Sequence, residues 1–199
     1  MKLKPSAILF DMDGVLVDSL DAWWFSLNEA LNQYNYKKIS KQDFIDVYWG
    51  HDLFDNIEKM DLDYEIGELC NKFYQKNIDK TVVFPDSINT LKKLDNYKKG
   101  LITNTPKDSA NQILTTYNLK NFFDVVVTSD DVEKAKPNPE IVFKACKKID
   151  VKPDKVVFIG DTKSDMEAAK KSGCTFIGVK LNTKYSIDNI NDILNIIQI

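Results

Sequence analysis

The feature that most constrains this fold is a short apolar segment that ends in two aspartates. Residues 7–10 are Ala-Ile-Leu-Phe, and Asp11-Met12-Asp13-Gly14 follows directly. An apolar run of this length between polar residues is typical of a buried strand rather than of a helix. In α/β sheets, ligands bind beyond the carboxyl ends of the strands. The segment therefore predicts a buried strand that presents Asp11 and Asp13 where chemistry is expected.

From residue 81 onward, strand-like apolar runs alternate with helix-like segments. The strand-like runs are 81–84, 100–102, 123–127, 155–159 and 174–179. The helix-like segments are about 86–96, a segment opened by Pro106, 140–149, 164–172 and 187–197. Such alternation predicts a parallel sheet with helices on both faces. We therefore expect an α/β fold whose core is a Rossmann-like, doubly wound parallel sheet.

Residues 18–82 interrupt this alternation with a pattern that is helical. Apolar residues in 20–31 recur at spacings of three and four, which is typical of an amphipathic helix. Further helices are expected at 40–48, 53–60 and 64–77, the first of these capped by Ser40 and followed by a break at Gly50. The pattern predicts an all-helical inserted domain at 18–82, with a catalytic core built from 1–17 and 83–199.

The composition weighs against several classes of partner. The formal net charge is −3 and no basic stripe stands out, which argues against nucleic acid. No apolar run approaches the roughly 18 residues of a membrane span, and the N-terminal run is too short for a signal peptide. The three cysteines are widely spaced and fit buried side chains in a reducing compartment. We therefore expect a cytoplasmic protein.

Polar residues follow four of the expected strands or their loops. They are Asp11 and Asp13, Thr103 and Asn104, Lys136, and Asp161 and Asp165. Taken singly, Thr103 and Asp161 could equally be helix caps or turn residues. Taken together, the parallel connections bring all four groups to one edge of the sheet. Clustered carboxylates repel one another unless a cation lies among them, and an oxygen-only ligand set favours magnesium.

The chain resembles the haloacid dehalogenase superfamily of phosphohydrolases, in the subgroup of phosphoglycolate phosphatase and β-phosphoglucomutase. The matching motifs are DMDGVLVDS at 11–19, TN at 103–104, KPNP at 136–139 and GDTKSD at 160–165. Their order and spacing extend over nearly the whole chain, which makes the resemblance specific. It implies a helical cap domain at 18–82 and a magnesium-dependent phosphatase that hydrolyses a small-molecule phosphomonoester. The implied partner is a small phosphorylated metabolite.

The resemblance also implies a catalytic role for each of the first two aspartates. Asp11 would be the nucleophile that forms an aspartyl-phosphate. This agrees with elementary chemistry, because a carboxylate is ionised at neutral pH and needs no base to attack phosphorus. Asp13 would protonate the leaving oxygen and later activate water.

Further residues are implied to bind the phosphoryl group and the metal. The Thr103 hydroxyl and the Asn104 backbone N–H would hold the phosphoryl oxygens, while Lys136 would neutralise charge between the phosphate and the nucleophile. The implied magnesium ligands are Asp11, Asp13, Asp161 and Asp165. Asp13 would contribute its main-chain carbonyl to the metal.

Alternatives to a phosphatase differ in how well they fit the sequence. Dehalogenases of the superfamily lack the second acid of the motif, so Asp13 weighs against carbon–halogen chemistry. A sugar phosphomutase remains an alternative, although all 27 basic residues are lysine and no arginine can grip a second phosphate. A non-catalytic phosphate-binding regulatory module is a third alternative, which the complete set of acids disfavours.

The single histidine, His51, lies in the expected helical insertion. We favour a surface or packing role for it and keep, as a hypothesis, that His51 contacts the leaving group as a specificity residue. The physiological substrate and the oligomeric state are left open by the sequence.

Overall fold

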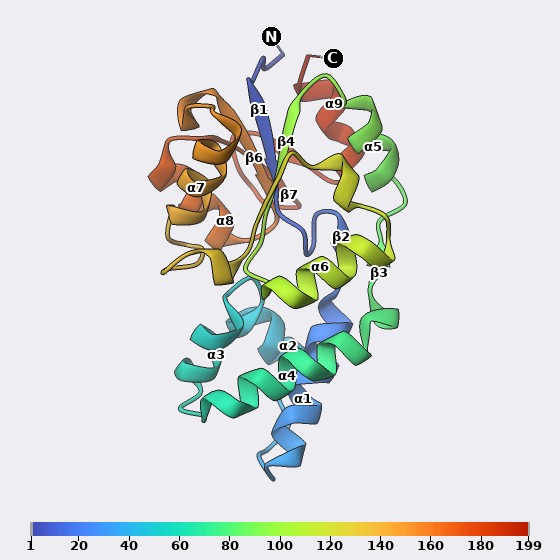
Figure 1. Cartoon of the computed structure of the whole chain (residues 1–199), viewed down its shortest axis with the longest axis vertical. Coiled ribbons are helices and arrows are strands. Elements are labelled where there is room, and N and C mark those ends of the chain that lie inside the picture. The colour runs from blue at the N-terminus through green and yellow to red at the C-terminus, as the bar shows by residue number, and fades with distance from the viewer. Residues whose placement is uncertain (1, 199) are drawn as a thin grey trace.

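The computed structural model describes residues 2–198 and has two parts, an α/β part and a helical part. Figure 1 shows the sheet with its helices at the top and the helical part below it. Both ends of the chain lie at the top, on the side of the sheet away from the helical part. The carboxyl ends of the strands therefore face the helical part.

The main sheet has six parallel strands in the order β5-β4-β1-β6-β7-β8. Their bounds are β1 Ala7–Phe10, β4 Lys98–Ile102, β5 Val125–Val127, β6 Val156–Gly160, β7 Thr175–Val179 and β8 Ser186–Ile187. The expected α/β class with a parallel sheet is confirmed. Because β1 pairs with β4 on one side and β6 on the other, Asp11 and Asp13 follow a strand in the middle of the sheet.

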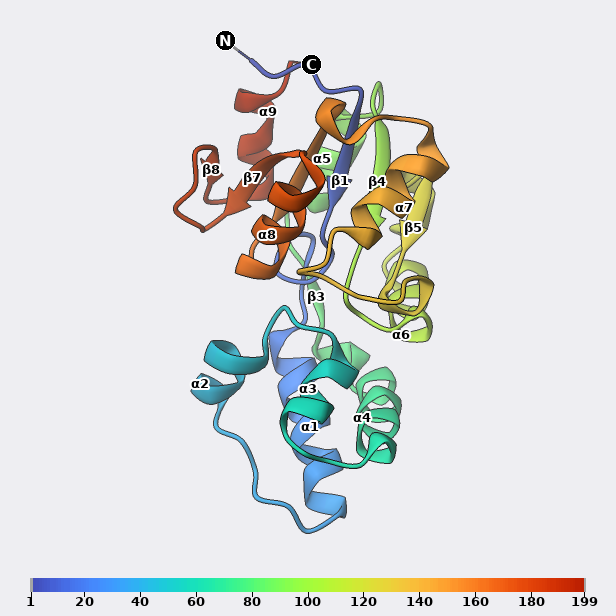
Figure 2. The same cartoon turned by 90° about the vertical axis from the view of Figure 1, so that its left-hand side faces the viewer.

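Alternate residues of β1 contribute to two hydrophobic layers. Ile8 and Phe10 belong to one core cluster, and Ala7 and Leu9 to the other, all without measurable exposure. This follows from the two-residue repeat of a strand. Helices cover both faces of the sheet (Figures 1 and 2). Their bounds are α5 Ser87–Lys93, α6 Lys107–Thr116, α7 Glu140–Ile149, α8 Lys163–Ser172 and α9 Ile193–Ile196.

The helical part forms a cap over the carboxyl ends of the strands. Its helices are α1 Leu20–Gln33, α2 Lys41–Asp43, α3 Leu53–Lys59 and α4 Tyr64–Lys76. Helices α1 and α4 pack along each other, and the ring of Trp23 stacks on Tyr74 with centroids 3.8 Å apart. Burial of such large apolar rings is a major stabilising contribution in a small helical unit. Trp23 therefore belongs to the packed core of the cap.

The connection between the two parts is a two-stranded antiparallel ribbon. It pairs β2 (Val17–Asp18) with β3 (Val82–Val83). Figure 2 shows β3 between the sheet and the cap. The expectation that 81–84 begins the alternation of the main sheet was therefore wrong. Val82 and Val83 instead pair with residues 17–18, the segment that leads from the sheet into the cap, and not with a parallel strand of the main sheet.

Two further segments differ from the sequence-based expectation. The helix expected at 40–48 is α2 followed by a π-helical turn, Phe44–Tyr48, in which the Trp49 N–H donates to the Phe44 carbonyl at 2.9 Å. The helix expected at 187–197 is shorter, because Ile187 belongs to β8. Asn189 and Asp192 form a capping box, so helical structure begins only after residue 189.

Within residues 2–198, short 3₁₀ turns lie at Ile78–Lys80, Lys120–Phe122, Ser129–Asp131, Pro153–Lys155 and Ile190–Asp192. Among residues 2–198, no helix combines the length and the apolar character needed to cross a membrane. The three cysteines are free.

The packing of the main sheet leads to a stability prediction. Leu101 in β4 is fully buried, so Leu101→Ala should lower the free energy of unfolding by about 2–5 kcal/mol through the cavity it leaves. Val82, in the connecting ribbon, is 60% exposed, and Val82→Ala should cost less than about 1 kcal/mol. Urea unfolding followed by circular dichroism measures both values. Equal losses for the two variants would contradict the described core.

Candidate active site

The first aspartate is fixed at the end of the central strand. The Asp11 N–H donates to the Ile159 carbonyl at 2.9 Å, which continues the parallel ladder by one residue. The Asp11 carboxylate accepts the Met12 N–H at 2.8 Å. Gly14 then turns the chain with a φ of +77°, and a Cβ at this position would lie 2.0 Å from Oδ2 of Asp161. Only glycine fits this turn, so the backbone conformation and the approach of Asp161 both require it.

Lys136 lies between two buried carboxylates. Its Nζ is 2.8 Å from Oδ1 of Asp11 and 2.7 Å from Oδ1 of Asp165. All three side chains are almost fully buried. Burial alone would lower the pKa of Lys136, but the charges of Asp11 and Asp165 outweigh burial and raise it. The ammonium group therefore stays charged and holds the two acids at fixed positions.

The loop that carries Lys136 is held by the neighbouring strand end. Asn104 donates from Nδ2 to the Lys136 carbonyl at 2.9 Å and accepts the Lys136 N–H at Oδ1, also at 2.9 Å. This pairing fixes the lysine backbone from both sides. The Asn104 backbone N–H makes no hydrogen bond within the described residues. It is thus a free donor in a buried setting.

Asp165 is positioned by the first turn of α8. Thr162 caps this helix, and its N–H and hydroxyl donate to Oδ2 of Asp165 at 3.0 Å and 2.6 Å. The other carboxylate oxygen receives Lys136. Gly160 makes room for this arrangement, since a Cβ there would lie 2.4 Å from Cβ of Asp165. The cap of α8 is thus Thr162 rather than Asp161, and it orients the Asp165 carboxylate.

Three of the predicted metal ligands form one cluster. Carboxylate oxygens of Asp11, Asp161 and Asp165 all lie within 4.8 Å of one another. Oδ1 of Asp161 is buried and has no hydrogen-bond partner among the described residues. A buried, unpartnered carboxylate oxygen is costly unless a cation binds it. The oxygen-only donor set fits a hard divalent ion.

The electrostatics of the cluster also favour a cation. Burial, followed by the charge of Asp165, raises the pKa of Asp161 to about 8. The same two causes raise the pKa of Asp11 well above its ordinary value, against the opposing effect of Lys136. The single positive charge of Lys136 thus does not compensate the negative charges of Asp11, Asp161 and Asp165. A divalent ion among them would restore the ionised form of the carboxylates.

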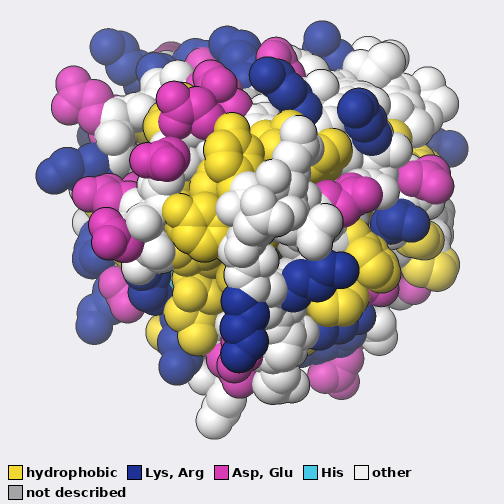
Figure 3. All heavy atoms as spheres, turned by 90° about the horizontal axis from the view of Figure 1, so that it is seen from below, with side chains coloured by type: hydrophobic (Ala, Val, Ile, Leu, Met, Phe, Trp, Pro, Cys, Tyr) yellow, Lys and Arg dark blue, Asp and Glu magenta, His cyan; other side chains and the backbone are white. Residues whose placement is uncertain are grey.

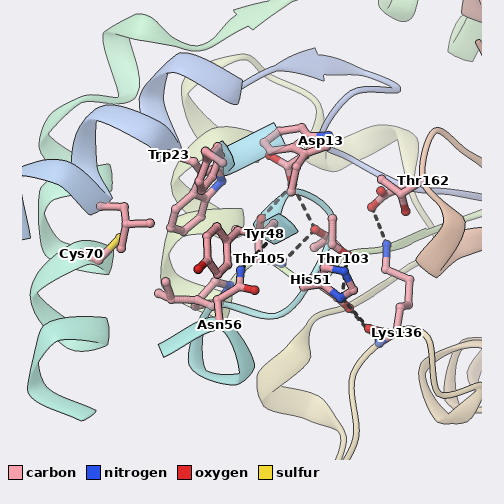
Figure 4. A pocket seen from close by; sticks show the side chains of 18 residues that line it. Asp13, Trp23, Tyr48, His51, Asn56, Cys70, Thr103, Thr105, Lys136 and Thr162 are labelled. Atoms are coloured by element: carbon pink, nitrogen blue, oxygen red, sulfur yellow. Dashed lines mark hydrogen bonds and ion pairs between the residues drawn. The ribbon is translucent and has the colours of Figure 1, made fainter. Parts of the chain in front are cut away.

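Asp13 lies outside this carboxylate cluster and faces hydroxyl groups. Ser19 donates to its Oδ1, and Thr103 and Thr105 donate to its Oδ2 at 3.2 Å and 2.7 Å. Figure 4 shows Asp13 above Thr103 and Thr105, with dashed lines for the contacts of these two hydroxyl groups. Sequence reasoning did not select Ser19 or Thr105 as site residues. The sequence feature that could have identified Thr105 is the polar run Thr103-Asn104-Thr105, because its third residue also contacts Asp13.

A loop of the cap closes over the sheet edge. The indole N–H of Trp49 donates to Oδ2 of Asp161 at 3.4 Å, and the Gly50 carbonyl accepts from Nδ2 of Asn104 at 3.2 Å. A Cβ on Gly50, whose φ is +80°, would lie 2.5 Å from Cγ2 of Thr162. The close approach requires glycine here. Trp49 packs edge-on against Phe44, and its ring nitrogen also contacts a predicted metal ligand.

The cap and the sheet edge enclose a cavity of about 60 Å³. The core contributes Asp11, Asp13, Thr103, Asn104, Thr105, Pro106, Lys136 and Thr162, and the cap contributes Trp23, Leu27, Phe44, Tyr48, Trp49, Gly50, His51, Leu53, Asn56 and Cys70 (Figure 4). His51 lines the cavity but its side chain is exposed. The cavity thus has a polar floor and a largely apolar roof.

The predicted site residues are brought to this cavity from four strand ends. Asp161 and Asp165 do not line the cavity. They lie beside it in the acid cluster, and Asp11 belongs both to that cluster and to the cavity lining. In this arrangement the Thr103 hydroxyl donates to Asp13, and the Asn104 side chain holds the lysine loop. The site combines a buried nucleophile candidate, a charge-neutralising lysine and a cation-fitting acid cluster.

Comparisons with known proteins agree with this geometry. The family model described as haloacid dehalogenase-like hydrolase matches residues 8–179. The chain is 28% identical over 213 residues to a pyrophosphatase PpaX of Bacillus mycoides (strain KBAB4), covering 98% of each chain.

Two solved structures illustrate the similarity of fold. One is the crystal structure of a predicted phosphoglycolate phosphatase from Haemophilus somnus 129pt, with a TM-score of 0.80, 22% identity and coverage of 96% of this chain and 97% of that chain. The other is β-phosphoglucomutase from Clostridium difficile, with a TM-score of 0.83, 20% identity and coverage of 94% and 92%. The family match extends from the central strand to β7 and includes every strand end that builds the site. The chain therefore belongs to the haloacid dehalogenase-like hydrolase family.

Proposed function

We propose that this hydrolase is a magnesium-dependent phosphatase that cleaves a small-molecule phosphomonoester through an aspartyl-phosphate on Asp11. The observation that carries the proposal is the buried Lys136, bonded to Asp11 and Asp165 beside an acid cluster that fits a divalent ion. Such a site stabilises a phosphoryl group that passes between two oxygen atoms. Magnesium, when bound, supplies positive charge for the phosphoryl oxygens and for the acids.

Asp11 is the proposed nucleophile. Its carboxylate would attack phosphorus and form an acyl-phosphate bond while the oxygen of the leaving group departs. Lys136, at 2.8 Å, offsets the negative charge that the carboxylate and the phosphoryl group bring together. Because the Asp11 carboxylate is held through Oδ1 by the Met12 N–H and by the lysine, little reorganisation is needed.

Asp13 is the proposed acid and base. In the first step it would donate a proton to the departing oxygen, and in the second it would take a proton from the water that attacks the acyl phosphate. The hydroxyl groups of Ser19 and Thr105 hold its carboxylate in place. The Thr103 hydroxyl also donates to this carboxylate at 3.2 Å, and its single proton would turn to the phosphoryl group when substrate binds. We propose that its main-chain carbonyl contributes to the magnesium site, together with Asp11, Asp161 and Asp165.

Three groups are proposed to bind the phosphoryl oxygens. They are the hydroxyl of Thr103, the backbone N–H of Asn104 and the ammonium of Lys136. The free N–H of Asn104 supports this assignment. His51 remains a candidate specificity residue, because it lines the cavity at an exposed position.

The domain division and the compartment are also proposals. Residues 18–82 are proposed as the cap domain and 1–17 with 83–199 as the catalytic core, since the chain crosses between them through the β2–β3 ribbon. The free cysteines fit the reducing cytoplasm.

Hydrolysis is favoured over phosphomutase chemistry by the cap. A mutase must hold a second phosphate, yet no lysine of the cap lines the cavity among the described residues. The names of similar proteins suggest pyrophosphate or phosphoglycolate as substrates to assay. A purely regulatory role is disfavoured because the nucleophile candidate, the lysine and the acid cluster are all in place.

Replacement of the nucleophile tests the reaction class. Asp11→Asn should reduce magnesium-dependent release of phosphate from p-nitrophenyl phosphate by at least about a thousandfold, because an amide is a poor nucleophile. Asp108→Asn, an exposed position on α6, is the matched control and should stay within about twofold of the unchanged protein. Activity that survives in Asp11→Asn, or persists in EDTA, would contradict the proposal.

Replacement of Asp13 separates the two chemical steps. With p-nitrophenyl phosphate the leaving group needs little protonation, so Asp13→Asn should still form the acyl phosphate but hydrolyse it slowly. Stopped-flow absorbance should therefore show a burst of about one p-nitrophenolate per enzyme followed by slow turnover. Linear turnover at the unchanged rate would assign the acid and base role elsewhere.

The raised pKa of Asp161 predicts how metal binding depends on pH. A carboxyl group whose pKa rises from 3.8 to about 8 on folding binds its proton more tightly in the folded protein. Its contribution therefore makes the metal-free protein less stable as pH rises across that range. Magnesium competes with this proton, so the increase in Tm on adding Mg²⁺ should be larger at about pH 8 than at about pH 6.

Thermal unfolding with Mg²⁺ or with EDTA at the two pH values measures the effect. Asp161→Asn, which removes the titrating group and one ligand, should reduce both the Tm increase and its pH dependence. An increase in Tm that is equal at both pH values, or that persists in Asp161→Asn, would contradict the assigned site.

A further inference from the structure

The roof of the cavity differs from its floor in charge. The floor carries the carboxylates of Asp11 and Asp13 and the ammonium of Lys136, which the proposed reaction uses. The roof is formed by aromatic, aliphatic and thiol side chains of the cap, with two polar side chains, His51 and Asn56, among them. Any part of a substrate that extends from the phosphoryl group toward the cap must contact this roof.

The cap has lysines, but they lie on its outer surface. All of those between residues 18 and 82 are exposed, namely Lys37, Lys38, Lys41, Lys59, Lys72, Lys76 and Lys80. Lysine side chains stand at the surface in the view from below (Figure 3). None of them lines the cavity. Since the chain contains no arginine, a second anionic group of a substrate would have no cationic partner in the roof.

Two of these lysines have partners that keep them outside. Lys41 pairs with Asp21, with Nζ and Oδ1 2.5 Å apart. Lys59 contacts a lining residue from outside, because its Nζ lies 5.7 Å from the centroid of the Tyr48 ring and donates to the Val47 carbonyl at 3.4 Å. The roof itself therefore remains uncharged.

The buried polar side chain of the roof is uncharged. Asn56 is buried, and its Nδ2 donates to the Tyr48 carbonyl at 2.9 Å. This leaves the amide oxygen as an acceptor and the second N–H of the amide as a donor, both of them uncharged. A neutral alcohol can bond to either group, whereas neither group supplies the positive charge that would compensate a buried carboxylate or phosphate. Burial of an unpaired charge against such a surface is strongly unfavourable.

From these contacts we infer that the leaving group of the substrate is small, uncharged and largely apolar. The inference rests on the proposed phosphatase function and names its substrate class, a monoester of phosphate with a neutral alcohol. Substrates whose leaving group carries a carboxylate or a second phosphate are disfavoured. Leu27, Phe44 and Leu53 are the apolar residues of the roof that contact this leaving group.

A matched set of substrates tests the inference on the magnesium-loaded protein. Propyl phosphate, 2-phosphoglycolate and pyrophosphate differ in the charge of the leaving group, and all three are assayed at the same pH. We expect kcat/KM for propyl phosphate to exceed both anionic values by at least about a hundredfold. An anionic substrate that is hydrolysed equally well or better overturns the inference, while hydrolysis of p-nitrophenyl phosphate still supports the phosphatase proposal.

Variants of the roof give a second readout. Leu53→Lys places a cation at the cavity wall, and Leu53→Gln is the neutral control. The ratio of kcat/KM for 2-phosphoglycolate to that for propyl phosphate should rise at least about tenfold in Leu53→Lys and stay unchanged in Leu53→Gln. A ratio does not depend on the fraction of folded protein. If Leu53→Lys fails to fold, the substrate ranking of the unchanged protein still decides.

Lys59→Gln tests whether an outer lysine reaches the cavity. Because Lys59 lies outside the lining, its replacement should leave the same ratio unchanged. A clear loss of 2-phosphoglycolate or pyrophosphate hydrolysis in Lys59→Gln would show that this lysine binds a second anion, which would overturn the inference.

Discussion

The contact of Lys136 with Asp11 and Asp165 is the interaction on which the site depends. It joins the central strand, the loop before α7 and the first turn of α8 through one buried ammonium group. Loss of such a central charge would leave two buried acids unpaired, which costs far more than an exposed ion pair contributes. The lysine therefore serves both the local structure and the proposed chemistry.

The topology of the sheet explains why these groups meet. Parallel strands place their carboxyl ends on one edge, and β1 lies between β4 and β6. The strand ends that carry Asp11, Thr103 and Asp161 are thus neighbours in space. The cap then covers this edge, and the contacts of Trp49 and Gly50 bring its loop onto the acid cluster and the lysine loop.

Sequence reasoning reached the sheet and the acids because both depend on local patterns. The bounds expected for the helix at 140–149 coincide with α7, and the apolar run at 7–10 is β1. It missed what depends on distant contacts. The hydroxyl of Thr105 and the indole of Trp49 acquire their roles only through the positions of Asp13 and Asp161. Likewise, β2 and β3 pair across the entire cap, a separation at which no local pattern reports the partner.

The proposed account places a covalent phosphoryl group on Asp11. Rapid acid quench of the enzyme during turnover, followed by mass spectrometry of the intact chain and of its peptides, detects this intermediate directly. The account predicts a mass increase of one phosphoryl group located in the peptide that contains Asp11, and none in Asp11→Asn. Turnover without any phosphorylated chain, or with the group on another residue, would contradict it.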